Sequence, residues 1–214
     1  MDIKAIIFDL DGTILNTRPV YKKATQEMFP DLSEEESLKF GLKIGQEIEK
    51  FGLNSVKSLS EKDLTYWLDL WFKNQEELSS IFEDFYPLIK TIKEKSLLTA
   101  INTNRPHSGE EVKDQLRNYG LDNYFDLIVT SAEVGKRKPD PAGLLKICNT
   151  FNLSVSQALF VGDSNADVLS GRNARMNVIA LTTGVFLKND LENINPFLIC
   201  DSLKDVENYI LLNI

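Results

Sequence analysis

The chain has 214 residues, of which 43% are hydrophobic and 26% charged, and its formal net charge is −8. This size and composition are typical of one soluble globular domain, or of one domain that carries a smaller insert. The acidic balance argues against general binding to nucleic acid or to anionic membranes, which requires a basic surface, and no apolar run reaches the roughly 18 residues of a membrane span.

Short, continuous apolar runs predict buried strands at Ala5–Phe8, Leu97–Ile101, Leu127–Thr130, Leu159–Val161 and Val178–Leu181. Runs of Ile, Val, Leu and Phe without alternation are typical of parallel strands that are covered on both faces. Helical patterns lie between them at Ser108–Asn118, Pro141–Phe151 and Ala166–Ala174. This alternation predicts an α/β fold with a doubly wound, mainly parallel, Rossmann-like sheet, whose ligands bind beyond the C-terminal ends of the strands.

The segment from residue 16 to residue 85 shows amphipathic helices and no convincing buried strand. Capping-box spacing at Ser33–Glu36 and at Ser60–Asp63 indicates two helix starts. The second helix has one apolar face, which we interpret as helix packing rather than ligand stacking, formed by Leu64, Trp67, Leu68 and Trp71. We therefore expect an all-helical cap domain of residues 16–85, inserted into a catalytic core of residues 1–15 and 86–214.

Four polar clusters fall at the ends of predicted strands or in the loops that follow. In chain order they are Asp9-Leu10-Asp11-Gly12-Thr13, Thr103-Asn104, Lys138 in GKRKPDP, and Asp163 with Asp167 in LFVGDSNADV. Each cluster alone is an ordinary turn, helix start or solvated side chain. In a doubly wound sheet, however, all four can converge on one rim.

The residue types in these clusters indicate a particular chemistry. Carboxylates without histidine or cysteine partners are typical of a hard-cation site, and oxygen ligands suit Mg²⁺. His107 is the single histidine, which excludes a His-rich zinc site. Mg²⁺ suits phosphoryl groups. One carboxylate can then attack phosphorus and a second can carry the leaving group's proton, while a hydroxyl and an ammonium hold the remaining oxygens.

The four clusters resemble the motifs of the haloacid dehalogenase-like (HAD) superfamily, and within it the phosphoglycolate phosphatase-like branch. The signatures D-x-D-G-T, T-N-[KR], K-P-D-P and G-D-S-x-x-D match Asp9–Thr13, Thr103–Arg105, Lys138–Pro141 and Gly162–Asp167. The helical insert falls where this branch carries its helical C1 cap. Arg175 departs from the family pattern, which usually has Gly there, and a left-handed backbone at this residue would cost on the order of 1 kcal/mol.

The resemblance implies a Mg²⁺-dependent phosphatase that hydrolyses a small, phosphoglycolate-like phosphomonoester through an aspartyl-phosphate intermediate. Asp9 would be the nucleophile and a metal ligand. Asp11 would be the general acid and base, with its backbone carbonyl on the metal. The phosphate ligands would be Thr103, Asn104 and Lys138, and the metal site would be completed by Asp163 and Asp167.

Substrate specificity is less visible in the sequence. Candidates for contacting the non-phosphate part of a small phosphorylated metabolite are Arg18, Lys43 and Gln46 in the predicted cap. Arg105 and His107 are candidates for positions beside the phosphate.

Other functions share some of these motifs. A phosphomutase of the β-phosphoglucomutase kind has the same four elements and stays an alternative. A non-enzymatic, phospho-accepting receiver switch is more remote, because receivers are shorter and carry no helical insert after the first strand. Asp11 argues against a dehalogenase, which lacks a second acid, and against a phosphonatase, which has Ala at that position.

The cysteines and the N-terminal sequence bear on the compartment. Cys148 and Cys200 are isolated in the sequence, which is typical of reduced structural thiols. The N-terminal residues show neither the cationic lead nor the apolar run of a secretion signal. We expect a cytoplasmic monomer or homodimer that binds neither nucleic acid nor membranes.

Overall fold

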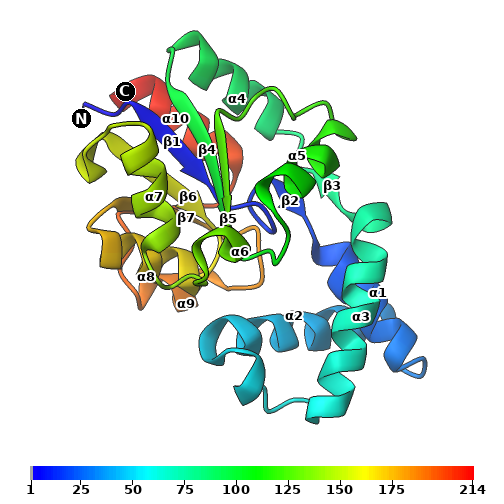
Figure 1. The fold of residues 1–214 in the computed structure, drawn as a ribbon. Helices are drawn as coiled ribbons and strands as arrows, with labels where there is room; N and C mark the ends of the chain where they lie inside the picture. The colour runs from blue at the N-terminus through cyan, green and yellow to red at the C-terminus, as the bar shows by residue number, and fades with distance from the viewer. Residues whose placement is uncertain (1) are drawn as a thin grey trace.

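The computed structural model describes residues 2–214, without the side chains of Phe51 and Asn54. Its main sheet is parallel, with the strand order β5-β4-β1-β6-β7-β8 (Figure 1). These strands are β1 (Ala5–Phe8), β4 (Leu98–Thr103), β5 (Leu127–Thr130), β6 (Ala158–Gly162), β7 (Asn177–Leu181) and β8 (Leu198–Cys200). The first strand therefore lies inside the sheet, hydrogen-bonded to β4 on one side and to β6 on the other.

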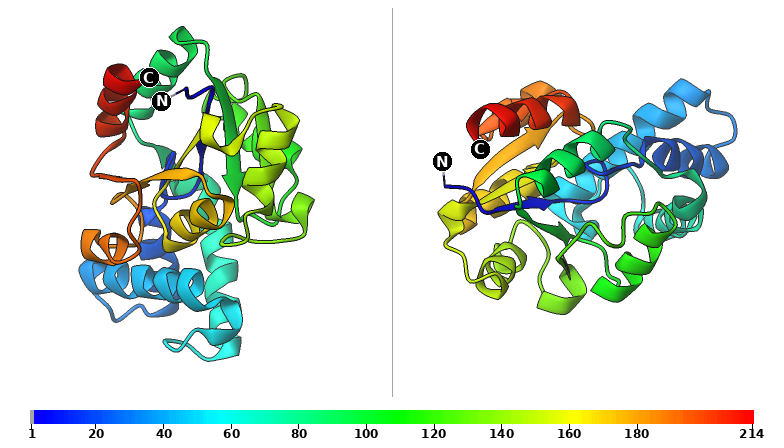
Figure 2. Two further views of the ribbon diagram at one scale, coloured as in Figure 1. Left: turned by 90° about the vertical axis from the view of Figure 1, so that its left-hand side faces the viewer. Right: turned by 90° about the horizontal axis from the view of Figure 1, so that it is seen from above.

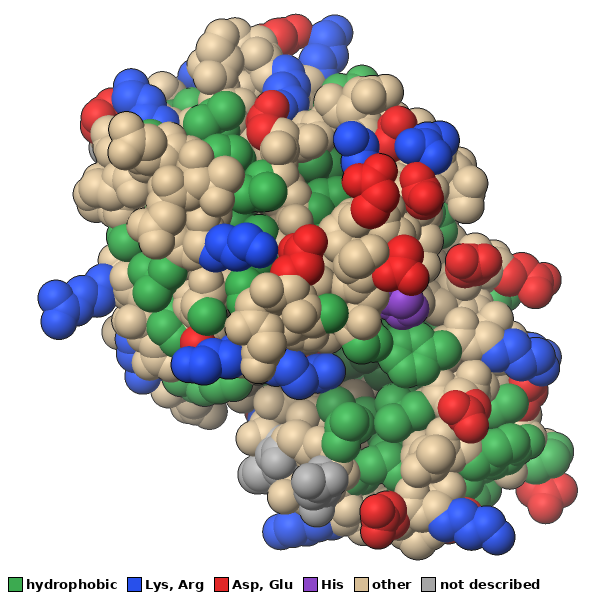
Figure 3. Space-filling model, in the orientation of Figure 1, with side chains coloured by type: hydrophobic (Ala, Val, Ile, Leu, Met, Phe, Trp, Pro, Cys, Tyr) green, Lys and Arg blue, Asp and Glu red, His purple; other side chains and the backbone are tan. Residues whose placement is uncertain are grey.

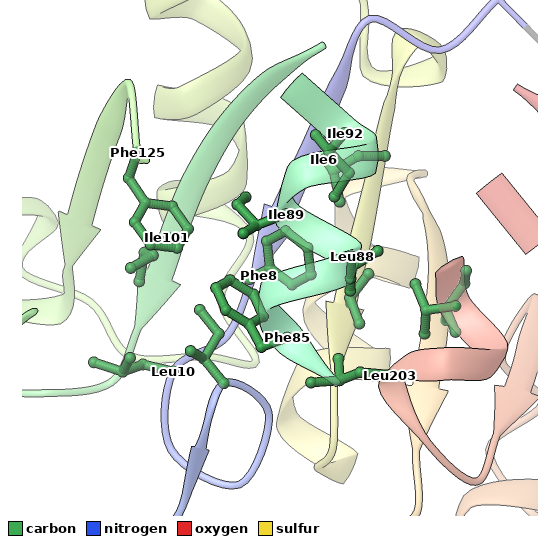
Figure 4. Close-up of a cluster of buried hydrophobic side chains, with 14 of the residues drawn as sticks. Ile6, Phe8, Leu10, Phe85, Leu88, Ile89, Ile92, Ile101, Phe125 and Leu203 are labelled. Atoms are coloured by element: carbon green, nitrogen blue, oxygen red, sulfur yellow. The ribbon is translucent and has the colours of Figure 1, made fainter. Parts of the chain in front are cut away.

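Helices cover both faces of this sheet (Figure 2). One face packs against α4 (Phe85–Glu94), α5 (Gly109–Arg117) and α10 (Leu203–Asn213), and the other against α7 (Ala142–Thr150), α8 (Asn165–Ala174) and α9 (Lys188–Glu192). Successive β1 side chains alternate between the two faces. Figure 4 shows Phe8 beside Phe85 on the first face. The centroids of the two rings are 5.5 Å apart.

The predicted α/β fold is confirmed, and all five predicted strands are present with ends shifted by at most two residues. The sixth strand of the main sheet, β8, was not predicted, because three residues are too few to show a pattern. The remaining short elements are α6 (Ser131–Val134) and the 3-10 helices Leu53–Ser55 and Val155–Gln157. Within residues 2–214, no helix has both the length and the apolar character needed to cross a bilayer.

Between β1 and α4 the chain forms a helical insert of α1 (Arg18–Met28), α2 (Glu34–Phe51) and α3 (Glu61–Leu78). Ser33 and Ser60 cap α2 and α3, as their spacing predicts. The three helices share an apolar cluster that includes Trp67 and Trp71. The indole N–H of Trp67 donates a 3.0 Å hydrogen bond to the hydroxyl of Thr25, which ties α3 to α1.

The chain enters and leaves this insert side by side. The two crossing segments pair as short antiparallel strands, β2 (Leu15–Asn16) and β3 (Ser80–Ile81). The expectation of no buried strand between residues 16 and 85 agrees with these elements, because Asn16, Ser80 and Ile81 are exposed or half-buried. The two short strands themselves were not predicted, because two residues leave no periodic signal. The division into core and cap at residues 15 and 85 stays a prediction.

Arg175 ends α8 in a left-handed conformation, with φ of +60°. The sequence therefore departs from Gly at a position where Gly would carry no steric cost.

Gly41 in α2 packs closely against the backbone of α1. A Cβ atom there would lie 2.6 Å from the carbonyl oxygen of Tyr21 and 2.7 Å from the hydroxyl of Thr25, so Gly41 lets α1 and α2 approach closely.

We expect Gly41→Ala to lower the free energy of unfolding. The overpacked contact with α1 costs about 1–3 kcal/mol, which equals or exceeds the roughly 1 kcal/mol that Ala gains over Gly in helix propensity. Urea denaturation followed by tryptophan fluorescence measures this in the insert, because both tryptophans of the chain lie in α3. Lys43→Ala, an exposed change on the same helix, is the control. An unchanged midpoint for Gly41→Ala would contradict the packing argument.

Candidate active site

Five predicted side chains lie buried together at the carboxyl end of the sheet. Asp9 directly follows β1, where its backbone N–H donates to the carbonyl of Val161 at 2.8 Å. The others come from the end of β4, the loop before α7, the end of β6 and the first turn of α8: Thr103, Lys138, Asp163 and Asp167. All five are at most 8% exposed. The predicted convergence of segments from most of the chain is therefore present in the structure.

The Lys138 ammonium lies between two carboxylates. Its Nζ donates to Asp9 Oδ1 at 2.5 Å and to Asp167 Oδ1 at 2.6 Å. These two contacts raise the pKa of Lys138 against the opposing effect of burial. Asn104 holds the lysine's backbone, since its Oδ1 accepts from the Lys138 N–H at 2.7 Å. The side chain of Asn104, predicted to bind phosphate, thus positions the lysine.

Three carboxylates form an acidic cluster around this ammonium. Asp9, Asp163 and Asp167 each place an oxygen within 4.8 Å of those of the others. Burial, together with the neighbouring Asp167 charge and against the lowering effect of Lys138, raises the pKa of Asp9 to about 7. Burial and the charges of Asp9 and Asp167 raise the pKa of Asp163 well above its usual range. The cluster is therefore short of positive charge.

Tight backbone contacts fix the carboxylate of Asp163. The Thr13 hydroxyl donates to its Oδ1 at 2.6 Å. A Cβ atom at Gly184 would lie 1.7 Å from Asp163 Oδ2, and one at Gly12, where φ is +85°, would lie 2.4 Å from it. Glycine at both positions therefore leaves the space that the carboxylate occupies.

The cluster fits a divalent cation. Three carboxylates against one ammonium leave two uncompensated negative charges in the buried cluster. The donors are all oxygens, which favour hard cations such as Mg²⁺. The residues that would hold the ion are Asp9, Asp163 and Asp167. The Asp11 side chain lies outside this group, in agreement with a contribution from its backbone carbonyl alone.

Asp11 instead makes a bidentate ion pair with Arg105. Arg105 Nε donates to Asp11 Oδ2 at 2.7 Å, and its Nη2 donates to Oδ1 at 2.6 Å. Gln75 of α3 donates to the same Oδ1 at 3.1 Å, and Gln115 of α5 accepts from Arg105 Nη1. Arg105, a predicted specificity residue, therefore orients the second acid. Neither Gln75 nor Gln115 had a sequence signal that could have identified it.

A cavity of about 290 Å³ opens between this cluster and the helical insert. Its core side includes Asp9, Asp11, Thr103, Lys138 and Asp163. Its insert side is largely apolar and includes Tyr21, Ile48, Leu53, Trp67, Leu68, Trp71 and Phe72, together with Glu49. Three residues of the α3 stripe that was predicted to serve packing therefore also line the cavity.

The remaining specificity candidates have different positions. Arg18 lines the cavity, and its Nη1 donates to the carbonyl of Gly184 at 3.3 Å. Lys43 is exposed on another surface beside Phe29 and Phe40 and does not line this cavity, so the structure does not bring it to the site. Gln46 donates to the Val185 carbonyl at 2.5 Å and ties α2 to the core. His107 packs edge-on against the Phe72 ring, 6.3 Å away.

A parallel α/β sheet with an acidic cluster at its carboxyl end, below a helical insert, is the arrangement that the sequence motifs predict. The family model for haloacid dehalogenase-like hydrolases matches residues 6–181. The chain belongs to this family.

Similar proteins agree with this assignment. The chain is 25% identical over 225 aligned positions to a phosphoglycolate phosphatase of Psychrobacter arcticus, covering 99% of this chain and 97% of that protein. It is 27% identical to the pyrophosphatase PpaX of Halalkalibacterium halodurans, covering 96% of each. The solved structure of the haloacid dehalogenase-like family protein SP0104 from Streptococcus pneumoniae has a TM-score of 0.79 at 21% identity, covering 98% of this chain and 99% of that one.

We expect Mg²⁺ to raise the melting temperature of the protein, because an ion that binds only the folded state stabilises it by mass action. At about 10–100 times the dissociation constant, the rise is about 3–10 °C. Asp163→Asn should lose most of this shift, and Asp69→Asn, an exposed change on α3, should keep it. Differential scanning fluorimetry with and without EDTA measures both. A shift that survives in Asp163→Asn would place the ion elsewhere.

Proposed function

We propose that the protein is a Mg²⁺-dependent phosphatase that hydrolyses a small phosphorylated metabolite through an aspartyl-phosphate intermediate at Asp9. The observation that carries this proposal is the position of the Asp9 carboxylate. It lies at the floor of the cavity, is held by the Lys138 ammonium and is adjacent to two further buried acids. A carboxylate so fixed is a nucleophile with charge stabilisation already in place.

In the first step, an Asp9 oxygen attacks phosphorus. The new Asp9 oxygen–phosphorus bond forms while the bond between phosphorus and the substrate oxygen breaks, and Asp11 gives a proton to the departing alcohol. Lys138 and the Thr103 hydroxyl hold the non-bridging phosphoryl oxygens. In the structure both Asp11 oxygens accept from Arg105, which is the arrangement of an ionised carboxylate. One of these contacts has to be released for Asp11 to carry the proton to the substrate.

In the second step, water attacks the same phosphorus. Asp11 takes the proton from that water, the Asp9 oxygen–phosphorus bond breaks, and inorganic phosphate leaves with the Asp9 carboxylate restored. Mg²⁺, held by Asp9, Asp163, Asp167 and the Asp11 backbone carbonyl, would neutralise charge on the phosphoryl oxygens when bound.

Two of the relatives are named as a phosphoglycolate phosphatase and a pyrophosphatase. These names support hydrolysis of a phosphate ester or a phosphoanhydride by this chain as well. The position of the helical insert over the acidic cluster supports a role as a cap that shields the reaction from water. We place the reaction in the cytoplasm, where phosphorylated metabolites and Mg²⁺ occur together.

We expect Asp9→Asn to abolish Mg²⁺-dependent release of p-nitrophenolate from p-nitrophenyl phosphate, because the amide cannot attack phosphorus. Circular dichroism should show the wild-type fold, and Asp69→Asn should retain full turnover as the matched control. Chelation by EDTA should stop the wild-type enzyme and added Mg²⁺ should restore it. Turnover by Asp9→Asn would overturn the assignment of the nucleophile.

Asp11→Asn should separate the two steps. The p-nitrophenolate ion needs no proton to leave, so the first step should proceed and release about one equivalent per enzyme. The second step should then stall, because no base takes the proton from water. Intact-mass spectrometry should find one added phosphoryl group on the enzyme. Steady turnover without a burst would argue against the assigned role of Asp11.

The wild-type enzyme incubated with a hexose 1-phosphate tests the alternative function. An isomerised ester without released phosphate would indicate a phosphomutase.

A further inference from the structure

The insert side of the cavity is an aromatic wall. Trp67 and Trp71 of α3 lie with ring centroids 5.8 Å and 5.7 Å from that of Tyr21, and Phe72 adds a ring 5.3 Å from Trp71. All four residues line the cavity. Figure 3 shows hydrophobic side chains gathered where the insert faces the core. This wall lies opposite the phosphate-binding end of the cavity, where the organic group of a phosphate ester would extend.

One carboxylate lies within this wall. Glu49 of α2 lines the cavity, is half-buried and makes no hydrogen bond or ion pair with the described side chains. Burial raises its pKa, and the Lys138 charge across the cavity opposes that rise. An unpaired carboxylate inside an apolar wall calls for an explanation, and a ligand that carries the opposite charge is one.

The basic side chains around the cavity are already engaged or peripheral. Lys138 lies between Asp9 and Asp167, and Arg105 is paired with Asp11. Arg18, the basic lining residue of the insert, donates to a backbone carbonyl of the core. Arg137 also lines the cavity, from an exposed position. A second anion on the part of the cavity formed by α2 and α3 would meet the Glu49 carboxylate and the aromatic rings.

Building on the phosphatase reaction above, we propose that the organic group of the substrate carries an alkylated ammonium on a short aliphatic chain. Glu49 and the aromatic wall would bind this group. The negative faces of the rings attract a cation. The Glu49 carboxylate supplies the opposite charge. The same two features disfavour anionic esters such as phosphoglycolate.

Two esters of the same shape test this proposal. Choline phosphate carries a quaternary ammonium, and 3,3-dimethylbutyl phosphate places a neutral carbon at the same position. We expect kcat/KM of the wild-type enzyme to be about tenfold higher for the charged ester, and phosphoglycolate to be the poorest of the three. Glu49→Gln, which keeps shape and removes charge, should reduce the ratio of the two isosteric esters several-fold. Glu192→Gln, an exposed change on α9, should leave that ratio unchanged.

Equal or faster turnover of the neutral ester, or phosphoglycolate as the best substrate, would overturn the proposal. These three esters compared on the wild-type enzyme decide it even where Glu49→Gln fails to fold in a thermal melt. Mg²⁺-dependent turnover of p-nitrophenyl phosphate is measured beside them. If p-nitrophenyl phosphate is turned over but the three esters do not follow the expected order of kcat/KM, this inference alone is wrong. If p-nitrophenyl phosphate is not turned over, both the phosphatase reaction and this inference are wrong.

Discussion

The Lys138 ammonium lies between the carboxylates of Asp9 and Asp167, and the carboxyl end of the sheet is arranged around that contact. Three acids in a buried cluster repel one another strongly, because the protein interior screens charge poorly. Other features limit this cost locally. Thr13 donates to Asp163, Ser164 donates to Asp167, and Asn104 holds the backbone of the lysine. The repulsion that protein groups leave uncompensated would favour binding of the divalent cation proposed above.

The helical insert is joined to this charged centre by polar contacts. Gln75 of α3 reaches Asp11, while Arg18 and Gln46 reach the neighbouring carbonyls of Gly184 and Val185 after β7. Gly184 also lies against the carboxylate of Asp163. The segment around Gly184 therefore contacts both the acidic cluster and the helical insert. A shift of the insert relative to the core would act on Asp163 through this segment.

Much of this arrangement could be predicted from the sequence, because continuous apolar runs and the polar residues that end them are local signals. The five longer strands, the N-caps at Ser33 and Ser60 and the convergence of Asp9 with Asp163 follow from such signals. The pairing of Arg105 with Asp11 could not, since the two are 94 residues apart and depend on how β4 lies beside β1. The position of Lys43 away from the cavity could not be predicted for a related reason, since the rotation of α2 about its axis decides which of its side chains face the core. Glu49, on the same helix, faces the cavity but gave no signal in the sequence.

The antiparallel pairing of β2 with β3 brings Leu15 opposite Ile81, so the insert begins and ends almost at one point of the core. A segment whose ends already meet adds little loop-closure entropy to folding of the rest, whatever its length. It can therefore be lengthened, shortened or replaced during evolution without moving a strand of the main sheet. Apart from the few residues that contact the core, such as Gln75, Arg18 and Gln46, changes in α1, α2 and α3 can therefore reshape the cavity while the acidic cluster keeps its place.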